Sequence, residues 1–297
     1  MRADRRLAYA LIAPAVLILL AILAYPMARL ILLSFQRFDS RSLFTGEAPL
    51  VGFDNYTRVL TDPQFWEVLA RTAGVTIVTV LAVMVAGFGL AQLLRKAAGW
   101  ARVTLLVGLV LIWAMPMVSS AIIWQWMFQP QYGVMNWILT RLVIFGDLSA
   151  HNWFGNTFEA LTIIIVMVVW KGLPFVALTL YAGMTQIPEE LYEAAALDGA
   201  RAGAITRNIT VPMLAPIIGV LTTLQVIWSV NSFTPFWVLT QGGPAGGTTT
   251  LSIYAYVKAL SANDYGAGAA ISILTVLILS TFAIVYVRRL SAQGEIS

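Results

Sequence analysis

The chain has 297 residues, of which 59% are hydrophobic and only 11% are charged, with a net charge of +4. A soluble domain carries about a quarter charged residues, so this composition predicts a protein whose solvent is largely lipid. Cysteine is absent, which excludes disulfides, thiolate metal sites and cysteine nucleophiles. Basic residues gather at the ends of apolar runs, so a nucleic-acid surface is not expected.

Six apolar runs are long enough to cross a bilayer as helices, which takes about 20 residues each. The expected fold is therefore all-α and integral to the membrane, with six transmembrane helices within residues 7–288. A segment 1–6 precedes the spans, and a tail 289–297 follows them. Lys171 is the one clear charge inside a run. The runs are 7–33, 73–94, 103–128, 160–185, 213–232 and 266–287.

The first run also has a feature of a secretory signal, because Arg2, Arg5 and Arg6 precede it. Its apolar core is longer than the roughly 7–15 residues of a signal, and no small-x-small cleavage site follows it cleanly. Both properties favour a membrane span over a signal.

Basic residues at the run ends predict the orientation. The ends of the runs fall into two sets, one for each side of the membrane. One set carries more basic residues on shorter connecting segments, and segments rich in basic residues face the cytoplasm. We therefore expect a multi-pass protein of the cytoplasmic (inner) membrane with both termini inside. The cytoplasmic set consists of Arg2, Arg5, Arg6, Arg95, Lys96, Arg102, Arg201, Arg207, Arg288 and Arg289.

The outer segments carry helix and turn signals. Asp62 and Pro63 are typical of an N-cap and a first helical position, and they predict a short helix that leads into the second span. Apolar residues at helical spacing after Gly133 predict a helix at the membrane surface over residues 134–142. The glycine-rich segment 240–247 is not a phosphate-binding loop, because no Gly-Lys-Ser/Thr follows it. If ATP drives this protein, another chain must bind it.

The inner segment between the fourth and fifth runs is the most informative. Pro188 disfavours helix at Ile187 and permits a new helix to begin. Glu189 and Glu190 then suit the positive end of the helix dipole. Small alanines allow close approach of another protein, and Gly199 allows a sharp stop. This pattern predicts a short helix, a turn and a second short helix on the cytoplasmic face, with the next span starting at Pro212. Such an element is a docking surface, or else an ordinary inner loop.

This segment resembles the EAA loop of ABC-importer permeases, which have the type I importer fold. The resemblance rests on Glu193-Ala194-Ala195, Gly199, Ile209 and Pro212 at the spacing of that loop, with Val211 where leucine is usual. It implies that the segment, residues 187–212, inserts into an ATPase subunit and transmits its movement to the spans. The implied coupling residues are Glu189, Glu190, Glu193, Ala194, Ala195, Asp198 and Gly199.

Further segments resemble the first permease of carbohydrate importers, the maltose-permease type. They are Asp198–Ala200, Val51–Tyr56, Asp62–Trp66 and Val238–Pro244. The resemblance implies import of a disaccharide or oligosaccharide such as trehalose or maltose. The implied partners are a second homologous permease, two ATPase subunits, an extracytoplasmic binding (lipo)protein and membrane lipid. ATP and Mg would bind to the ATPase partners, and this chain would hold no cofactor.

Polar residues within the fourth and fifth runs suggest a substrate path. A charge inside a span usually faces a cavity or a partner, and Gly172 and Pro174 near Lys171 can open the helix locally. In the fifth run, Gln225, Trp228 and Ser229 share one helical face that combines a ring with hydrogen-bonding groups, as sugars require. The family builds its pocket from these two helices, although only Gly172 and the rings of Phe175 and Trp228 match its pattern. The candidate residues are Lys171, Gly172, Phe175, Gln225, Trp228, Ser229 and Asn231.

Other interpretations remain. Polar residues of the fifth run can bond a neighbouring helix, and Lys171 can pair with a carbonyl for purely structural reasons. Lys171 would also suit the anion of glycerol 3-phosphate or a glycerophosphodiester, which related permeases carry. A secondary transporter would need carboxylates within the spans, and none is present. A membrane enzyme is disfavoured because no residues lie at catalytic or metal-binding spacing.

Overall fold

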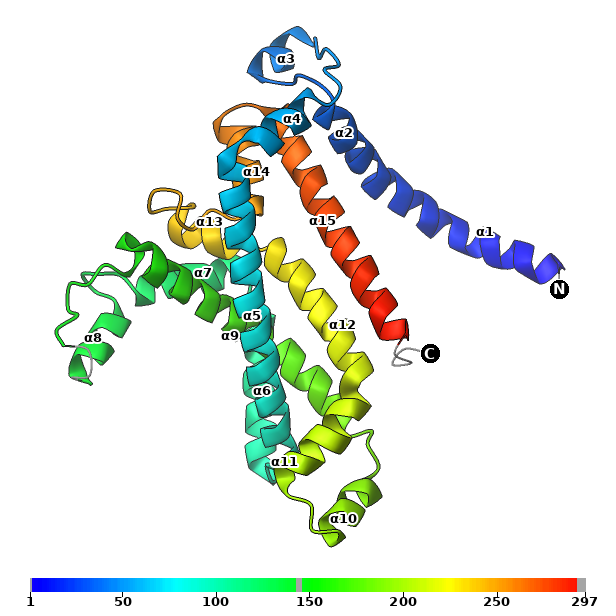
Figure 1. The fold of residues 1–297 in the computed structure, drawn as a ribbon, viewed down its shortest axis with the longest axis vertical. Coiled ribbons are helices and arrows are strands. Elements are labelled where there is room, and N and C mark those ends of the chain that lie inside the picture. The colour runs from blue at the N-terminus through cyan, green and yellow to red at the C-terminus, as the bar shows by residue number, and fades with distance from the viewer. Residues whose placement is uncertain (1, 143–145, 293–297) are drawn as a thin grey trace. The chain divides into compact units, whose positions relative to one another are not determined.

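The computed structural model describes residues 2–142 and 146–292, which form helices joined by loops and contain no β-strand (Figure 1). The expected all-α class is thus confirmed. Residues 293–297 of the expected tail lie outside the described residues. The chain divides into two compact units, Met1–Glu67 with Tyr254–Ile278, and Val68–Ile253 with Leu279–Ser297. The long helices α5 (Pro63–Lys96) and α15 (Tyr265–Ala292) pass from one unit to the other.

The first unit begins with a long apolar helix made of α1 (Arg2–Leu19), a π turn (Leu20–Ala24) and α2 (Tyr25–Ser34). The π turn lies just before Pro26, which has no N–H to donate to the preceding turn, so a wider turn is easily accommodated there. The side chains of residues 11–29 are all exposed. An apolar helix of this length without cover from its own chain matches the predicted first span.

The polar end of the first unit contains α3 (Ser40–Thr45) and α4 (Asp54–Thr61). The buried Asn55 amide donates to the carbonyls of Ser34 and Gln36, both at 2.9 Å, and so ties α4 to the end of α2. Asp62 accepts from the Gln64 N–H at 2.9 Å, as an N-cap residue does. The expected separate short helix after it is wrong, because α5 runs unbroken from Pro63 to Lys96.

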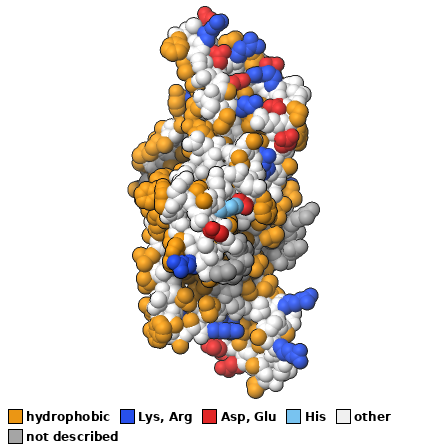
Figure 2. Space-filling view, turned by 90° about the vertical axis from the view of Figure 1, so that its left-hand side faces the viewer, with side chains coloured by type: hydrophobic (Ala, Val, Ile, Leu, Met, Phe, Trp, Pro, Cys, Tyr) orange, Lys and Arg blue, Asp and Glu red, His pale blue; other side chains and the backbone are white. Residues whose placement is uncertain are grey.

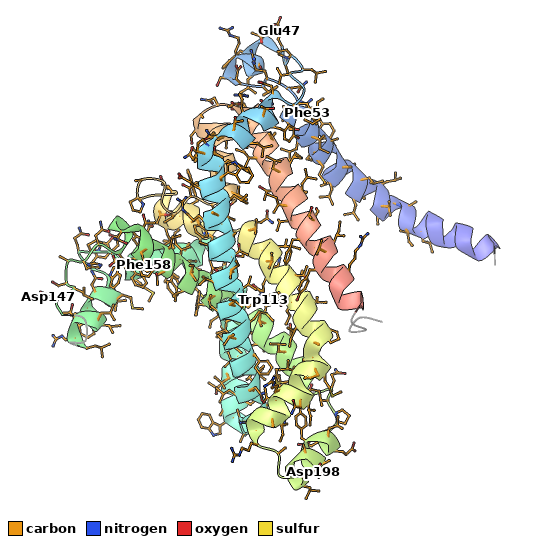
Figure 3. All side chains as sticks on the ribbon, viewed as in Figure 1. Glu47, Phe53, Trp113, Asp147, Phe158 and Asp198 are labelled. Atoms are coloured by element: carbon orange, nitrogen blue, oxygen red, sulfur yellow. The ribbon has the colours of Figure 1, made fainter. Side chains whose placement is uncertain are left out.

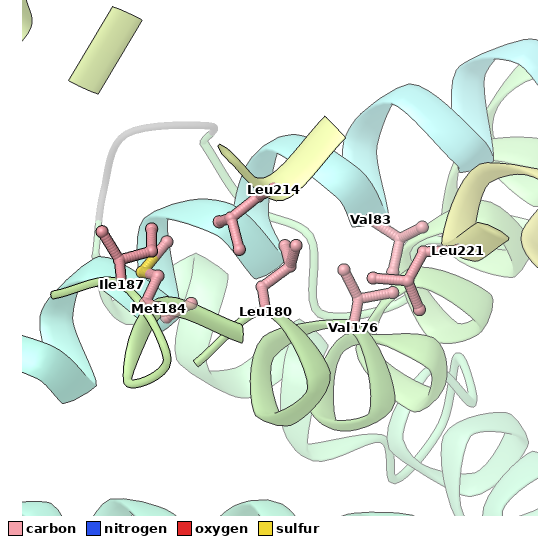
Figure 4. Packing of buried hydrophobic residues seen from close by; sticks show 8 residues of the cluster. Val83, Val176, Leu180, Met184, Ile187, Leu214 and Leu221 are labelled. Atoms are coloured by element: carbon pink, nitrogen blue, oxygen red, sulfur yellow. The ribbon is translucent and has the colours of Figure 1, made fainter. Parts of the chain in front are cut away.

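The second unit contains most of the remaining elements, and its core lies between α5, α9 and α12 (Figure 4). Val83 of α5, Leu180 of α9 and Leu221 of α12 are fully buried there. A Cβ on Gly87 would lie 2.5 Å from Val176 Cγ1, so this glycine lets α5 and α9 approach closely. The helices are α6 (Gly99–Ala114), α7 (Met117–Met127), α8 (Val134–Arg141), α9 (Thr157–Met184), α10 (Glu189–Leu197), α11 (Ala202–Ile205), α12 (Val211–Val230), α13 (Thr234–Thr240) and α14 (Leu251–Tyr256), with the α14 C-terminus in the first unit. Shorter turns are the 3-10 turn Trp153–Gly155 and the π turns Thr206–Thr210 and Val257–Ser261, the last in the first unit.

The third predicted span is broken. α6 and α7 meet at Met115 and Pro116 with a bend of 100°. Both residues are extended, with ψ of 135° and 138°, because a residue before proline avoids the α region and proline cannot continue the ladder. Five described helices are long and apolar enough to cross a membrane, or six if the bent pair counts as one. The prediction of a single continuous third helix is therefore wrong, whereas its apolar extent is right.

Two further expectations about local structure are wrong. The second inner helix is not separate from the fifth span, because α11 continues through the π turn Thr206–Thr210 directly into α12. The wider turn lies immediately before Pro212, which lacks an N–H for a regular turn. In addition, α9 does not open at Gly172 and Pro174, since the helix is continuous from Thr157 to Met184.

Candidate functional site

The inner segment begins and ends by the local rules that its sequence predicts. Pro188 is extended, with ψ of 133°, and α10 starts at the next residue. At the other end Gly199 has φ of +74°. Its N–H donates to the Ala196 carbonyl at 3.0 Å, and the Ala200 N–H donates to the Ala195 carbonyl at 2.9 Å. These two bonds form a Schellman motif, which a residue with positive φ makes possible. The segment is therefore a compact helix with a sharply defined end.

The predicted coupling residues lie on the surface of this helix and its turn. Asp198 is at the tip of the segment (Figure 3), and Figure 2 shows charged side chains gathered at this end of the second unit. Of the seven candidates only Ala195 is half-buried, and the other six are exposed. Leu197 is 89% exposed beside them. A single exposed leucine is common on protein surfaces, and Leu197 was not among the predicted residues. In the sequence, Leu197 lies directly before Asp198 and Gly199, where the helix was predicted to end.

Four of the predicted path residues come together from α9 and α12. The rings of Phe175 and Trp228 meet edge to face at a centroid distance of 5.1 Å. One helical turn away, a Cβ on Gly172 would lie 3.5 Å from Gln225 Oε1. Gln225 is 6% exposed, and in the part of the chain that the structure describes its Nε2 has no hydrogen-bond partner. Ser229, the fifth residue on this side, is also buried. The cluster combines two rings with a buried amide nitrogen that has no hydrogen-bond partner among the described residues.

The other two predicted path residues point elsewhere. Lys171 Nζ donates to the carbonyls of Ile112 at 2.8 Å, Trp113 at 3.1 Å and Met115. These carbonyls belong to the end of α6 and the break after it, where the last carbonyls of a helix lack their regular partners. The Ile112 carbonyl also accepts from the Met115 N–H at 3.4 Å. Asn231 Nδ2 donates at 2.8 Å to the Ile227 carbonyl of its own helix. The structure thus gives both polar groups intrachain bonds.

No metal site is apparent in residues 2–142 and 146–292, where no three His, Asp or Glu side chains converge. The Nε2 of the single histidine, His151, lies 3.0 Å from Glu159 Oε2, and its ring stands at 79° to the Trp153 ring with the centroids 4.6 Å apart. It therefore forms part of the packing around the start of α9.

Comparison with known proteins places the chain in a family. Residues 79–293 match the family described as binding-protein-dependent transport system inner membrane component. The permease protein DasB of the diacetylchitobiose uptake system of Streptomyces coelicolor is 39% identical over 99% of this chain and 89% of its own length. The trehalose/maltose transport permease MalF of Thermococcus litoralis is 36% identical over 96% of this chain and 94% of its own length.

The fold has a close counterpart among solved structures. A chain of a bacterial ABC transporter involved in alginate import superposes with a TM-score of 0.82 at 20% identity, over 97% of this chain and 96% of that one. The relationship therefore covers the spans and the loops alike. Together with the apolar helices and the inner segment, these matches show that the chain belongs to the inner membrane components of binding-protein-dependent transport systems and is a multi-pass permease subunit of an ABC importer.

Proposed function

We propose that this permease imports a sugar of disaccharide or short oligosaccharide size, such as trehalose or maltose. Two relatives that match nearly the whole chain are named for diacetylchitobiose and for trehalose and maltose. A third, from Agrobacterium fabrum, is named for sulfoquinovosyl glycerol and is 38% identical over 96% of this chain. All three names denote a compound that contains a sugar ring.

The buried amide of Gln225 is the observation that carries this proposal. Its Nε2 has no partner within residues 2–142 and 146–292, and leaving a buried donor unpaired costs about 1–3 kcal/mol. A sugar hydroxyl would accept from it, while the rings of Phe175 and Trp228 offer apolar faces to the C–H groups of the sugar. Gly172 has no side chain, which lets α9 pass close to the amide: a Cβ there would lie 3.5 Å from Gln225 Oε1 and 3.3 Å from Val83 Cγ2.

Glycerol 3-phosphate and glycerophosphodiesters are disfavoured as substrates. Their recognition would require a free cation, and Lys171 is the one that the path offers. An ammonium group has three donors, and Lys171 directs its donors to three backbone carbonyls. The ammonium group of Lys171 is thus already bonded at the end of α6 and has no donor left for a phosphate.

The transport cycle that we propose needs partners. A second homologous permease would complete the path, and an extracytoplasmic binding protein would deliver the sugar. Two ATPase subunits would bind ATP and Mg and would contact α10 through Glu189, Glu190, Glu193 and Asp198. The exposed surface of α10 and its capped end support this role. The permease itself performs no covalent chemistry in this scheme, and both termini lie in the cytoplasm.

Transport by the reconstituted complex tests the substrate. The permease pair, its ATPases and its binding protein are placed in proteoliposomes, and ATP-dependent uptake of labelled trehalose, maltose, diacetylchitobiose and glycerol 3-phosphate is measured. We expect at least one sugar to be taken up and Gln225→Leu to lower its uptake about tenfold, as expected when a site loses a buried polar contact. Thr222→Val is the matched control, because that hydroxyl already donates within α12 to the Ile218 carbonyl. Uptake of glycerol 3-phosphate alone, or full sugar uptake by Gln225→Leu, would refute the proposal.

A further inference from the structure

Two side chains, Arg95 of α5 and Tyr192 of α10, join these two helices by a cation–π contact. Arg95 lies in the last turn of α5, and its Cζ is 3.7 Å from the centroid of the Tyr192 ring in α10. A guanidinium over a ring face is attracted by the negative potential of the π system. Tyr192 and Ala195 are the half-buried residues of α10, whose other side chains are exposed. Tyr192, which also packs against the buried cluster formed by α5, α9 and α12, is therefore the main contact of α10 with these helices.

The same tyrosine also reaches the helix on the other side of the segment. Its hydroxyl is 3.3 Å from the hydroxyl of Thr210, a buried residue in the π turn before α12. Gln92, one turn before Arg95, donates at 3.3 Å to the hydroxyl of Thr206 in that same turn. Tyr192 thus contacts α5 through its ring face and the start of α12 through its hydroxyl.

The space around the pair shows why packing alone does not fix α10. A cavity of about 300 Å³ lies beside the Tyr192 ring and is lined by Glu189 as well, so this side of α10 is not packed against other side chains. Arg102, which also lines the cavity, cannot replace Arg95, because its guanidinium already donates to the Ala97 carbonyl at 2.8 and 3.1 Å. The cavity is lined by Arg95, Arg102, Tyr181, Thr185, Glu189 and Tyr192, among others.

We propose that Arg95 and Tyr192 are positioning residues for coupling: they hold α10 at a fixed angle on α5 and α12, so that a push on α10 turns these helices together. This inference rests on the proposed contact between α10 and an ATPase. Without the pair, a movement of the ATPase would displace α10 alone, by bending the chain at the extended Pro188 and at the turn after Asp198, and would not move α5 and α12. ATP hydrolysis would then continue while less substrate crosses the membrane.

Mobility of α10 tests the pair without any transported substrate. The chain has no cysteine, so Leu197→Cys, at a position 89% exposed, takes a single spin label on this chain when the partner subunits are prepared without reactive cysteines. We expect Arg95→Gln and Tyr192→Leu to narrow the EPR lines, which reports faster motion, and Tyr192→Phe, which keeps the ring, to stay near the unsubstituted spectrum. Lys96→Gln is the matched control, because this basic neighbour is exposed. Identical spectra for all four variants would overturn the proposal.

The coupling ratio tests the consequence. In the same complex, we expect Arg95→Gln and Tyr192→Leu to lower the number of substrate molecules imported per ATP about fivefold while ATP hydrolysis is retained. Arg95→Lys keeps a cation and should recover part of the ratio, which a loss of folding would not allow. An unchanged ratio in a variant with a mobile label would refute the role in coupling. A wild-type complex that imports none of the tested sugars refutes the proposed substrate and leaves the spin-label result decisive for the pair.

Discussion

Gly199 sets the end of the coupling segment through its backbone alone. Its φ is +74°, and a Cβ built on it would meet nothing within 4 Å. Gly199→Ala therefore adds no clash with neighbours, but it places an L side chain in the left-handed region at a cost of about 1–2 kcal/mol. We expect this change to loosen the Schellman motif and to reduce uptake by the reconstituted complex, while the chain still inserts into the membrane.

The matched control for Gly199 is Gly203, in α11. It also has open space around its Cβ position, but its φ is not positive, so Gly203→Ala should leave uptake unchanged or slightly improve stability. Gly199→Asn should lie between wild type and alanine, because asparagine tolerates positive φ better than other residues with a side chain. Equal uptake by the two alanine variants would contradict a role for the backbone at Gly199.

Asp62 gives the first unit a dependence on pH. Burial by itself would raise the pKa of Asp62, but hydrogen bonds from Tyr254 at 2.8 Å, from the Gln64 N–H and from Lys258 outweigh it and hold the pKa below its usual value. Burial and the same bond to Asp62 raise the pKa of Tyr254. A carboxyl whose pKa is lowered in the folded state stabilises the fold above its ordinary pKa of about 4, and this contribution is lost as the pH falls.

The test is thermal unfolding of the detergent-solubilised complex between pH 6 and pH 3, as approximate limits chosen to bracket the carboxyl pKa. We expect the unfolding temperature of wild type to fall more steeply with decreasing pH than that of Asp62→Asn. Glu47→Gln, at an exposed position on the same unit, should follow wild type. Parallel curves for wild type and Asp62→Asn would show that this carboxylate contributes nothing in the folded state.

At the scale of elements, Lys171 compensates for the break between α6 and α7. Carbonyls without partners at the break would be costly in lipid, and the ammonium group donates to those of Trp113 and Met115 and adds a bond to that of Ile112, which also accepts from the Met115 N–H. Removing hydrogen bonds to a charged group costs about 2 kcal/mol, so Lys171→Met should lower the unfolding temperature of the complex. The volume-conserving change Leu173→Met, on the next position but one, should be close to neutral. If Lys171 instead binds only substrate, the methionine variant would lose transport and keep its unfolding temperature.

These elements also show which features the sequence predicts. Apolar runs report composition along the chain, so they located the long helices well. They could not report the break after Met115, because Met115, Pro116 and Met117 are as apolar as the helix around them. The start and end of α10 depend on neighbouring residues and followed from Pro188 and Gly199. By contrast, the contacts of Lys171 with α6 and of Arg95 with Tyr192 join distant parts of the chain. No rule of local spacing predicts such pairs.

At the scale of the whole molecule, the orientation of the chain depends on whether the bent pair α6–α7 crosses the membrane. Phe44 in α3 is 88% exposed and lies before α5, and Leu197 in α10 is 89% exposed and lies after α9. Three candidate crossings separate them if the bent pair is a span, and two if it is a re-entrant loop. An odd number of crossings puts the two residues on opposite sides, and an even number puts them on the same side.

Because the chain has no cysteine, Phe44→Cys and Leu197→Cys can each be probed with a membrane-impermeant maleimide. With six spans, we expect Phe44→Cys to react in right-side-out vesicles and Leu197→Cys only in inverted ones, which matches the excess of basic residues on the cytoplasmic ends. Reaction of both variants from the same side would mean that α6 and α7 enter and leave by one face. If both variants reacted only in right-side-out vesicles, α10 would lie outside the cell. It could not then contact the cytoplasmic ATPases, and the proposed coupling would be refuted.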